Sequence, residues 1–458
     1  MPPRKSTSRK TRFSKARKPL PGPVKTTGLD RESEDVDIVG SSKKTMVKPT
    51  CKLTDVKETD VFGVEKLNIS ALINDLEKWA GVKCLHLMKW AEGKHDVIYR
   101  CEFRDGSNTI EHIIVRLCKP CLTSKQLESE IATMRYCRDF IPSIPIPSVF
   151  HCNLIPQNPI GCEYSVHTVA SGLTARTMWQ YWTQEEKLTL MDSLANVLHE
   201  LFTHRVGGFG SLYLVTQGQK TLDKFEIGET IKPQFFNQSF QRSVAPFESV
   251  KPRIAAPLRP WNTANAWMVA NVRLQLEYLE QYPEHAAISV GWDIAKYPTC
   301  LDGYKSVLKG LISLSEIVLC PPELPFSVNS ALWRPYLNMD DIMFLPDNAK
   351  ITSLLDWEMT AVVPLWQAAT VPEFMEEGPN RKPAELLSCY RDRFLMRMGE
   401  LDALMDTTRA EVVKWTDCYL QGKIFRELKE HCDRQWYELD QRTRALMDAW
   451  AALVSPAL

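Results

Sequence analysis

The chain has 458 residues, of which 44% are hydrophobic and 24% are charged, with a formal net charge of zero. This composition is that of an ordinary globular protein with enough apolar material for a large core. No run reaches the roughly 18 apolar residues that cross a membrane, and no apolar stretch follows the first charges, so we expect neither a membrane partner nor a secretory signal. The sequence therefore predicts an intracellular protein.

The zero net charge conceals a basic N-terminus. Residues 1–28 contain nine Lys and Arg and no acid, which leaves 47 basic against 56 acidic residues in the rest of the chain. This acidic body argues against nucleic acid as its partner. Residues 1–60 are predicted to be a disordered tail and linker, because they contain few large apolar residues. A nuclear-localisation segment, a mitochondrial presequence and a solvated arm each fit the tail, so the location is nuclear or cytoplasmic, with mitochondrial as the alternative.

The cysteines and histidines do not form a metal or redox pattern. Thirteen cysteines without regular spacing predict free thiols in a reducing compartment. Cys118 and Cys121 follow a strand and have no second pair, so we interpret them as strand-end cysteines rather than half of a zinc or redox site. His199 and His204 lack an adjacent carboxylate pattern and are interpreted as ordinary helix residues.

Residues 61–170 predict a small β-rich lobe. A helix over Ala71–Trp79 has Ser70 as its N-cap and ends at Gly81. Two β-rich runs then predict strands joined by a tight turn at Asp105-Gly106, namely Val97–Phe103 and Thr109–Leu117.

A second helix completes the small lobe. Thr123 and Gln126 have capping-box spacing for a helix that reaches Arg138. The two prolines at 145 and 147 then force extended chain into a further strand, and Tyr164–Val169 predicts another.

Residues 171–458 predict a mainly helical second lobe. Thr183 and Glu186 form a second capping box before an apolar helical stripe, and the range 217–260 is predicted to be a long insertion loop. Further helices are expected at three places: Asn265–Glu280, Tyr304–Leu319 and Pro383–Leu453.

One short hairpin interrupts these helices. Ile342–Leu345 and Lys350–Leu355 are predicted strands around a four-residue turn, and the second strand ends in Asp356-Trp357-Glu358. A β-lobe, a helical lobe and a lone hairpin that ends in an acid predict an α+β fold of the bilobal protein-kinase-like type, in which a nucleotide lies between the lobes.

The residues around this hairpin resemble a known family. The run Trp333-Arg334-Pro335-Tyr336-Leu337-Asn338-Met339-Asp340-Asp341, followed by Asp356-Trp357-Glu358, resembles the fungal branch of the aminoglycoside phosphotransferase and choline kinase-like superfamily. The resemblance spans roughly residues 84–374. The family pattern is H-x-D-x-x-x-x-N, in which the Asp is the catalytic base, and a later D-W-E, in which the Asp holds magnesium together with the Asn.

The resemblance assigns roles to four positions, of which three have changed. The His becomes Arg334, the base becomes Tyr336, and the Asn becomes Asp341, while Asp356 is kept. Asp341 and Asp356 are therefore the predicted metal ligands, because oxygen ligands suit Mg²⁺. Tyr336 is a poor base at neutral pH because a phenol has a pKa near 10.

The small lobe contributes the expected nucleotide contacts. The resemblance makes Arg116 the strand cation over the nucleotide phosphates and Glu130 its ion-pair partner on the next helix. Gly93 lies where the phosphate loop is expected, and Val169 lies in the hinge whose backbone would meet adenine.

Two hypotheses follow from these assignments. The first is a catalytically impaired pseudokinase that still binds nucleotide, with ATP and Mg²⁺ as candidate cofactors and an unknown small molecule or protein as a partner. The alternative is an active ATP-dependent phosphotransferase that acts on a small hydroxylated or amino substrate, because phosphoryl transfer depends mainly on positioning and electrostatics.

Overall fold

The computed structural model describes residues 67–439, except 94, 105–109, 120–124, 218–219, 233–259, 292–296, 319–328, 346–349, 376–383 and 406–411, and also 443–445 and 447–448. The described residues belong to one compact unit, residues 44–458. Outside the described residues lie the predicted tail and linker, both predicted hairpin turns, Cys121 and Thr123.

The first lobe is built on a five-stranded antiparallel sheet. Its strands stand in the order β1-β2-β3-β5-β4 and have these bounds: β1 Cys84–Glu92, β2 Asp96–Arg104, β3 Ile110–Cys118, β4 Val149–Asn153 and β5 Tyr164–Thr168. In β2, buried and partly exposed side chains alternate, which is the period-2 pattern expected of a strand with one covered face. The expected strands at 97–103, 109–117 and 164–169 are thus confirmed to within two residues.

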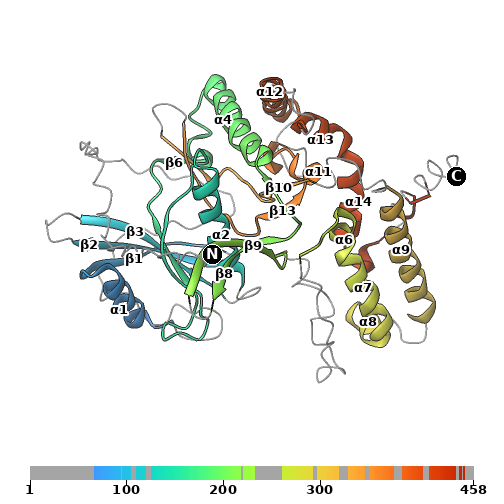
Figure 1. The fold of residues 1–458 in the computed structure, drawn as a ribbon, viewed down its shortest axis with the longest axis horizontal. Coiled ribbons are helices and arrows are strands. Elements are labelled where there is room, and N and C mark those ends of the chain that lie inside the picture. Colours follow the sequence, from blue (N-terminus) through green and yellow to red (C-terminus); the bar gives the residue numbers. More distant parts are fainter. Residues whose placement is uncertain are drawn as a thin grey trace, which may run out of the picture. The chain divides into compact units, whose positions relative to one another are not determined.

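Helix α1 (Ile69–Ala80) covers one end of this sheet (Figure 1). It begins two residues before the predicted start, because Asn68 rather than Ser70 is the N-cap and accepts a hydrogen bond from the backbone N–H of Ala71 at 2.9 Å. The predicted end is confirmed, since Gly81 adopts the left-handed conformation at φ 74°. The buried Leu72 and Leu76 join α1 to the core of the first lobe.

Helix α2 (Lys125–Phe140) lies between β3 and β4 in the chain and packs against a hairpin of β8 (Ser211–Gln217) and β9 (Lys220–Gly228). The long loop predicted from residue 217 is therefore wrong at its start, because residues 220–228 form strand β9. The alternation of Phe225 and Ile227 with Lys224 and Glu226 is the strand signal that the loop interpretation overlooked.

The second lobe contains the predicted hairpin inside a helical frame. Strand β11 (Ile342–Phe344) pairs with β12 (Ile351–Leu354) and with β6 (Leu173–Thr174), which extends into α3 (Ala175–Met178). Strand β10 (Ser330–Trp333) pairs with β7 (Arg205–Val206) and with β13 (Ala361–Pro364), which precedes α11 (Leu365–Ala368). The predicted capping box is confirmed, because Thr183 and Glu186 cap α4 (Gln184–Thr203) reciprocally.

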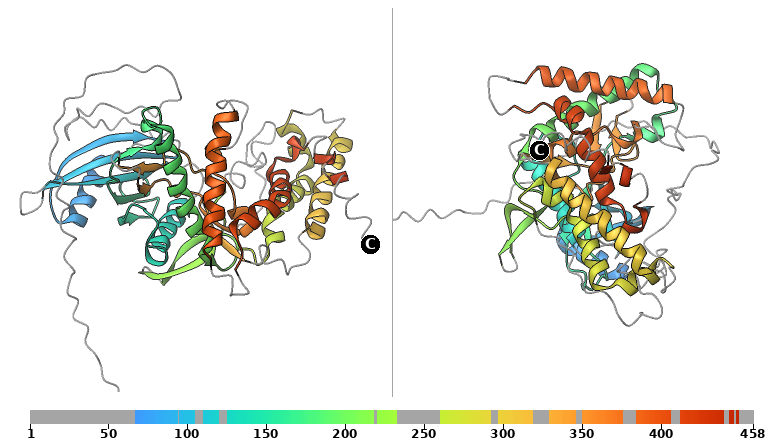
Figure 2. Two further views of the ribbon diagram at one scale, coloured as in Figure 1. Left: turned by 90° about the horizontal axis from the view of Figure 1, so that it is seen from above. Right: turned by 90° about the vertical axis from the view of Figure 1, so that its right-hand side faces the viewer.

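Two groups of helices surround these strands. Helix α12 (Ala384–Ala403) packs along α4, as the right-hand view of Figure 2 shows. Helix α13 (Trp415–Gln421) packs against α12 in the same core. The other helices form a second core: α6 (Ala264–Met268), α7 (Ala270–Gln281), α8 (Pro283–Ser289), α9 (Tyr297–Val318) and α14 (Lys423–Asp433). Short 3-10 turns cover Glu373–Met375 and Trp436–Glu438.

Two helix predictions needed adjustment. The helix predicted over 265–280 is two helices, because Val269 leaves helical geometry at φ −92° and ψ 4°. The helix predicted from 304 begins at Tyr297, seven residues earlier, since Pro298 is tolerated in a first turn. The prediction of several helices from residue 383 is confirmed by α12, α13 and α14.

Candidate functional site

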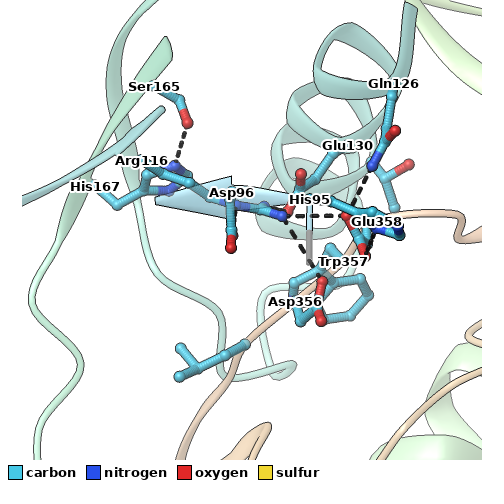
Figure 3. A network of polar contacts seen from close by, with 12 residues as sticks. His95, Asp96, Arg116, Gln126, Glu130, Ser165, His167, Asp356, Trp357 and Glu358 are labelled. Atoms are coloured by element: carbon cyan, nitrogen blue, oxygen red, sulfur yellow. Dashed lines mark hydrogen bonds and ion pairs between the residues drawn. The ribbon is translucent and has the colours of Figure 1, made fainter. Parts of the chain in front are cut away.

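The site is centred on Arg116, which β3 carries towards the second lobe (Figure 3). Its guanidinium contacts four carboxylates, of which two come from each lobe. Nε donates to Asp96 Oδ2 at 2.5 Å and Nη1 donates to Glu130. Nη2 lies 3.3 Å from Glu358 Oε2 and 3.9 Å from Asp356 Oδ1. The predicted strand cation and helix acid are therefore brought into direct contact.

Burial shapes the charges in this cluster. It raises the pKa of Glu130 to about 7, while Arg116 opposes the rise. Burial by itself would lower the pKa of Arg116, but Glu130 and Asp96 hold that pKa well above its ordinary value. Burial and the adjacent Arg116 lower the pKa of His167 to about 3, so His167 stays neutral. Arg116 is thus a permanent cation at physiological pH.

Three donors from separate elements converge on the carboxylate of Glu358. His95, in the turn after β1, has Nδ1 2.9 Å from Oε1. Gln126 Nε2 on α2 donates to Oε2 at 2.7 Å, and Arg116 donates to the same oxygen. Figure 3 shows these side chains pointing toward one another. Gln126, which the sequence suggested as half of a capping box, thus contacts the second lobe. This donor set binds an anionic group.

Backbone strain accompanies the Asp356-Trp357-Glu358 segment. Asp356 and Met359 are the non-glycine residues of the described chain with positive φ, at 59° and 60°. Such angles are uncommon outside glycine, although Asp tolerates them better than most residues. Strain of this kind persists only where the surroundings hold it, and it clusters at functional sites. In this segment the side chains of Asp356 and Glu358 reach Arg116 of the first lobe.

The three altered catalytic-loop positions lie in different surroundings. Arg334 is 7% exposed, and its guanidinium donates to the backbone carbonyls of Leu355 and, at 3.2 Å, Asp356. It also lies 3.5 Å from Asp341 Oδ2. Asp341 is 2% exposed and accepts from the backbone N–H of Asn338 at 3.1 Å. Tyr336, by contrast, is 50% exposed.

The predicted phosphate-loop position is a tight turn. Gly93 donates its backbone N–H to Asp96 O at 2.9 Å, and a Cβ at this position would come within 2.4 Å of Asp96 Oδ1. Lys119 Nζ donates to the carbonyl of Gly93 at 2.9 Å. A side chain at position 93 would therefore clash with Asp96, so a glycine here allows Asp96 to contact Arg116.

Val169 lies in a separate hollow. A cleft of about 700 Å³ adjoins it and the neighbouring hinge, between the segment that precedes β4, helix α4 and the β12 strand. The described lining includes Pro145, Asn196 and Thr352 but neither Arg116 nor Asp356. The structure thus brings Arg116, Glu130 and Asp356 together and places Val169 on this other cleft.

Other residues of the cluster were missed as functional residues. The sequence predicts no role for His95, Asp96 or Glu358, and only their convergence on Arg116 and on one another reveals them. The one available signal was Glu358 in the family's D-W-E. His199 is bound to Asp402 at 3.0 Å, which fits its interpretation as an ordinary helix residue.

The residues proposed for magnesium do not fit an octahedral oxygen site. Among the described residues, no group of three or more His, Cys, Asp or Glu could hold a metal ion. Asp341 is buried beside a guanidinium and already accepts a backbone hydrogen bond. Asp356 remains as the more exposed carboxylate, with a side chain 41% exposed. A single carboxylate is a sparse ligand set for Mg²⁺ unless substrate phosphates complete it.

The similar sequences are fungal. A subtelomeric hrmA-associated cluster protein of Aspergillus fumigatus is 22% identical over 339 residues, which cover 68% of this chain and 64% of that protein. The mitochondrial protein "altered inheritance of mitochondria 9" of Yarrowia lipolytica is 24% identical over 336 residues, covering 66% and 54%. The chain therefore spans less than two thirds of the length of these relatives. No family model matches the chain.

The similar solved structures include aminoglycoside phosphotransferases. The streptomycin–ATP ternary complex of APH(2")-IIa is 11% identical, covers 84% of this chain and 96% of that chain, and has a TM-score of 0.43. ADP-bound APH(2'')-Ib is 11% identical, with 85% and 97% covered and a TM-score of 0.43.

The fold assignment rests on the topology of the chain itself. A five-stranded sheet with a helix between its third and fourth strands precedes a helical lobe that holds the β11–β12 hairpin. The resemblance seen in the motifs is thus confirmed for the fold. This chain is a two-lobed protein with a protein-kinase-like fold.

Proposed function

We propose that this chain is a catalytically impaired pseudokinase that binds a nucleotide through its phosphates at the Arg116 cluster. The observation that carries the proposal is the convergence of His95, Arg116 and Gln126 on one carboxylate. A phosphate group offers the same kind of acceptor oxygens, and charge-assisted hydrogen bonds to it are stronger than neutral ones. The nucleotide phosphates would compete with Glu358 for these donors.

The loss of chemistry follows from position 336. The family places a carboxylate base there, whereas a tyrosine with a pKa near 10 in its unperturbed state is mostly protonated at neutral pH. A missing general base lowers a rate by about 10²–10⁴-fold. Tyr336 is half exposed, and its phenol is bulkier than the carboxylate that the family has at this position.

The second candidate is an active phosphotransferase that acts on a small hydroxylated or amino substrate. The kept Asp356 and the intact Arg116–Glu130 pair favour it, since phosphoryl transfer depends on positioning and electrostatics. Transfer of labelled phosphate from ATP separates the two candidates. The proposal expects nucleotide binding without transfer, whereas robust transfer would overturn the pseudokinase assignment.

The binding test removes the charges of the central pair together. The double variant Arg116→Gln/Glu130→Gln removes the cation together with its most buried carboxylate partner, and we expect its ATP affinity to fall at least tenfold in a fluorescence titration. The matched control is Arg273→Gln/Glu316→Gln, which removes an exposed ion pair on α7 and α9. Equal affinity of both variants and the wild type would contradict nucleotide binding at Arg116.

We also propose a cellular location for the protein and a boundary between its two lobes. We propose that the basic residues 1–28 direct the chain to the nucleus or act as a charged arm in the cytoplasm, with a mitochondrial destination as the alternative. The Yarrowia relative is named as a mitochondrial protein, which supports that alternative. No described helix is long and apolar enough to span a bilayer. The boundary near residue 170 falls between β5 and β6.

A further inference from the structure

We infer that Arg334 takes the place of a divalent cation at Asp341, so that the proposed nucleotide site at the Arg116 cluster binds phosphates without magnesium. This inference rests on the proposed function for its nucleotide, but the ion pair itself does not. The starting point is that two family positions differ together. The family's His becomes Arg334 and its neutral Asn becomes Asp341, so a positive and a negative charge are gained as a pair.

The contacts make Arg334 a fixed part of the catalytic loop. Its side chain is 2% exposed and that of Asp341 is 3% exposed, with 3.5 Å between Nη2 and Oδ2. The guanidinium also donates to the carbonyls of Leu355 and Asp356 and lies 5.3 Å from the ring centre of Trp357. It therefore joins the segment after β10 to the segment after β12.

A metal ion bound by the family's Asn and Asp would join these same two segments. A guanidinium cannot lose its proton in a protein, so Arg334 supplies a permanent positive charge at this point. A Mg²⁺ ion at Asp341 would have to approach that charge and replace the Arg334 contact in a site closed to solvent. The second predicted ligand, Asp356, also lies beside a guanidinium, 3.9 Å from Arg116. Asp341 is thus already paired with Arg334, while Asp356 lies beside an arginine that it shares with three other carboxylates.

The first test is a double-mutant cycle on thermal stability, which requires no nucleotide. Asp341→Asn leaves the buried guanidinium without its carboxylate, and Arg334→His removes the counter-ion of Asp341, so each should lower the melting temperature by several degrees. The double variant restores the family's His and Asn and should lose much less than the sum. Additive losses, or no loss on Asp341→Asn, would overturn the pairing.

The second test measures ATP affinity of the wild-type protein in MgCl₂ and in EDTA. We expect the two dissociation constants to agree within about twofold, because Arg334 already pairs with Asp341 and leaves Asp356 as a single candidate carboxylate ligand. In the double variant Arg334→His/Asp341→Asn, MgCl₂ should instead tighten binding. A tenfold or greater tightening by MgCl₂ in the wild type would overturn the inference.

The two tests also separate this inference from the proposed function. If the wild type binds no ATP under either condition, the proposed nucleotide site fails, while the stability cycle still decides whether Arg334 and Asp341 act as a pair. If ATP binds only with MgCl₂, the nucleotide site stands and the metal replacement is wrong.

Discussion

At the residue scale, the proposed loss of phosphoryl transfer rests on Tyr336. Restoring the family's residues at three positions, Arg334→His, Tyr336→Asp and Asp341→Asn, returns the base and the metal ligand together. We expect negligible phosphoryl transfer by the wild type and a gain on the order of 10²–10⁴-fold over it in the triple variant, which is the range that a general base contributes. Release of labelled phosphate and transfer to candidate hydroxyl acceptors measure this.

The control for this prediction is Arg334→His/Asp341→Asn with Tyr336 retained. It separates the effect of the base from that of the ion pair. Wild-type transfer that is vigorous and unaffected by Tyr336→Asp would show that the phenol is not the limiting feature.

A second residue-scale prediction concerns Lys232, which follows β9. Its Nζ lies 3.5 Å from Asp433 Oδ2 and 4.6 Å from the ring centre of Trp267, a ring that Lys429 Nζ also faces at 4.7 Å. Burial lowers the pKa of Lys232 from 10.5 to about 7, with Asp433 opposing and Lys429 adding to the shift.

The folded state therefore binds fewer protons than the unfolded chain between about pH 7 and 10.5. Linkage then requires the contribution of Lys232 to stability to rise with pH across this window, and to be lost as the pH falls through about 7. We expect the difference in unfolding free energy between the wild type and Lys232→Met to change in favour of the wild type from pH 7 to 10. Parallel pH profiles in chemical denaturation would refute this assignment.

At the element scale, the β8–β9 hairpin supports the helix that carries Gln126 and Glu130. Phe225 on β9 makes edge contacts with two aromatic rings of α2, Tyr136 at 5.2 Å and Phe140 at 5.8 Å between ring centres. Lys125 at the start of α2 also pairs with Glu229 just after β9, at 3.2 Å. The hairpin thus holds α2 in the position where Glu130 reaches Arg116.

The variant Phe225→Ala is expected to reduce the unfolding free energy by roughly 2 kcal/mol, less than the 3–5 kcal/mol of a fully buried phenylalanine, because Phe225 is only partly buried. It should also weaken ATP binding although it does not touch the Arg116 cluster. The control is Phe150→Ala, which removes an aromatic stacking contact with Trp79 on the other side of the small lobe. A loss of ATP affinity that is equal in both variants would contradict a specific role for the hairpin.

At the scale of the whole molecule, the basic tail and the acidic body are expected to act separately. Residues 1–28 carry nine positive charges and almost no large apolar residue, so they offer little to a core. Deleting them should leave the melting temperature of the body unchanged while it alters the location of a fluorescent fusion in a fungal cell. A body that unfolds after the deletion would show that the tail is structural.

The sequence alone determined the fold class, because its signals are local. Alternation marks the strands, capping boxes and Gly81 mark helix ends, and the spacing between Tyr336 and Asp356 carries the family pattern. Each of these depends on residues a few positions apart. The local signals erred where two of them competed, as at the cap of α1, where Asn68 and Ser70 both qualify and the helix begins at the former.

Apart from the Arg116–Glu130 pair, which the family resemblance implied, only the tertiary structure decided which charges meet. Glu358 lies 263 residues from His95 and 232 from Gln126, and no local pattern relates them. The same holds for Arg334, whose sequence suggested only a lost histidine until its contact with Asp341 made it a counter-ion. The strength of an ionic contact depends on the distance and the exclusion of water, and both are set when the two lobes pack rather than by any stretch of the chain.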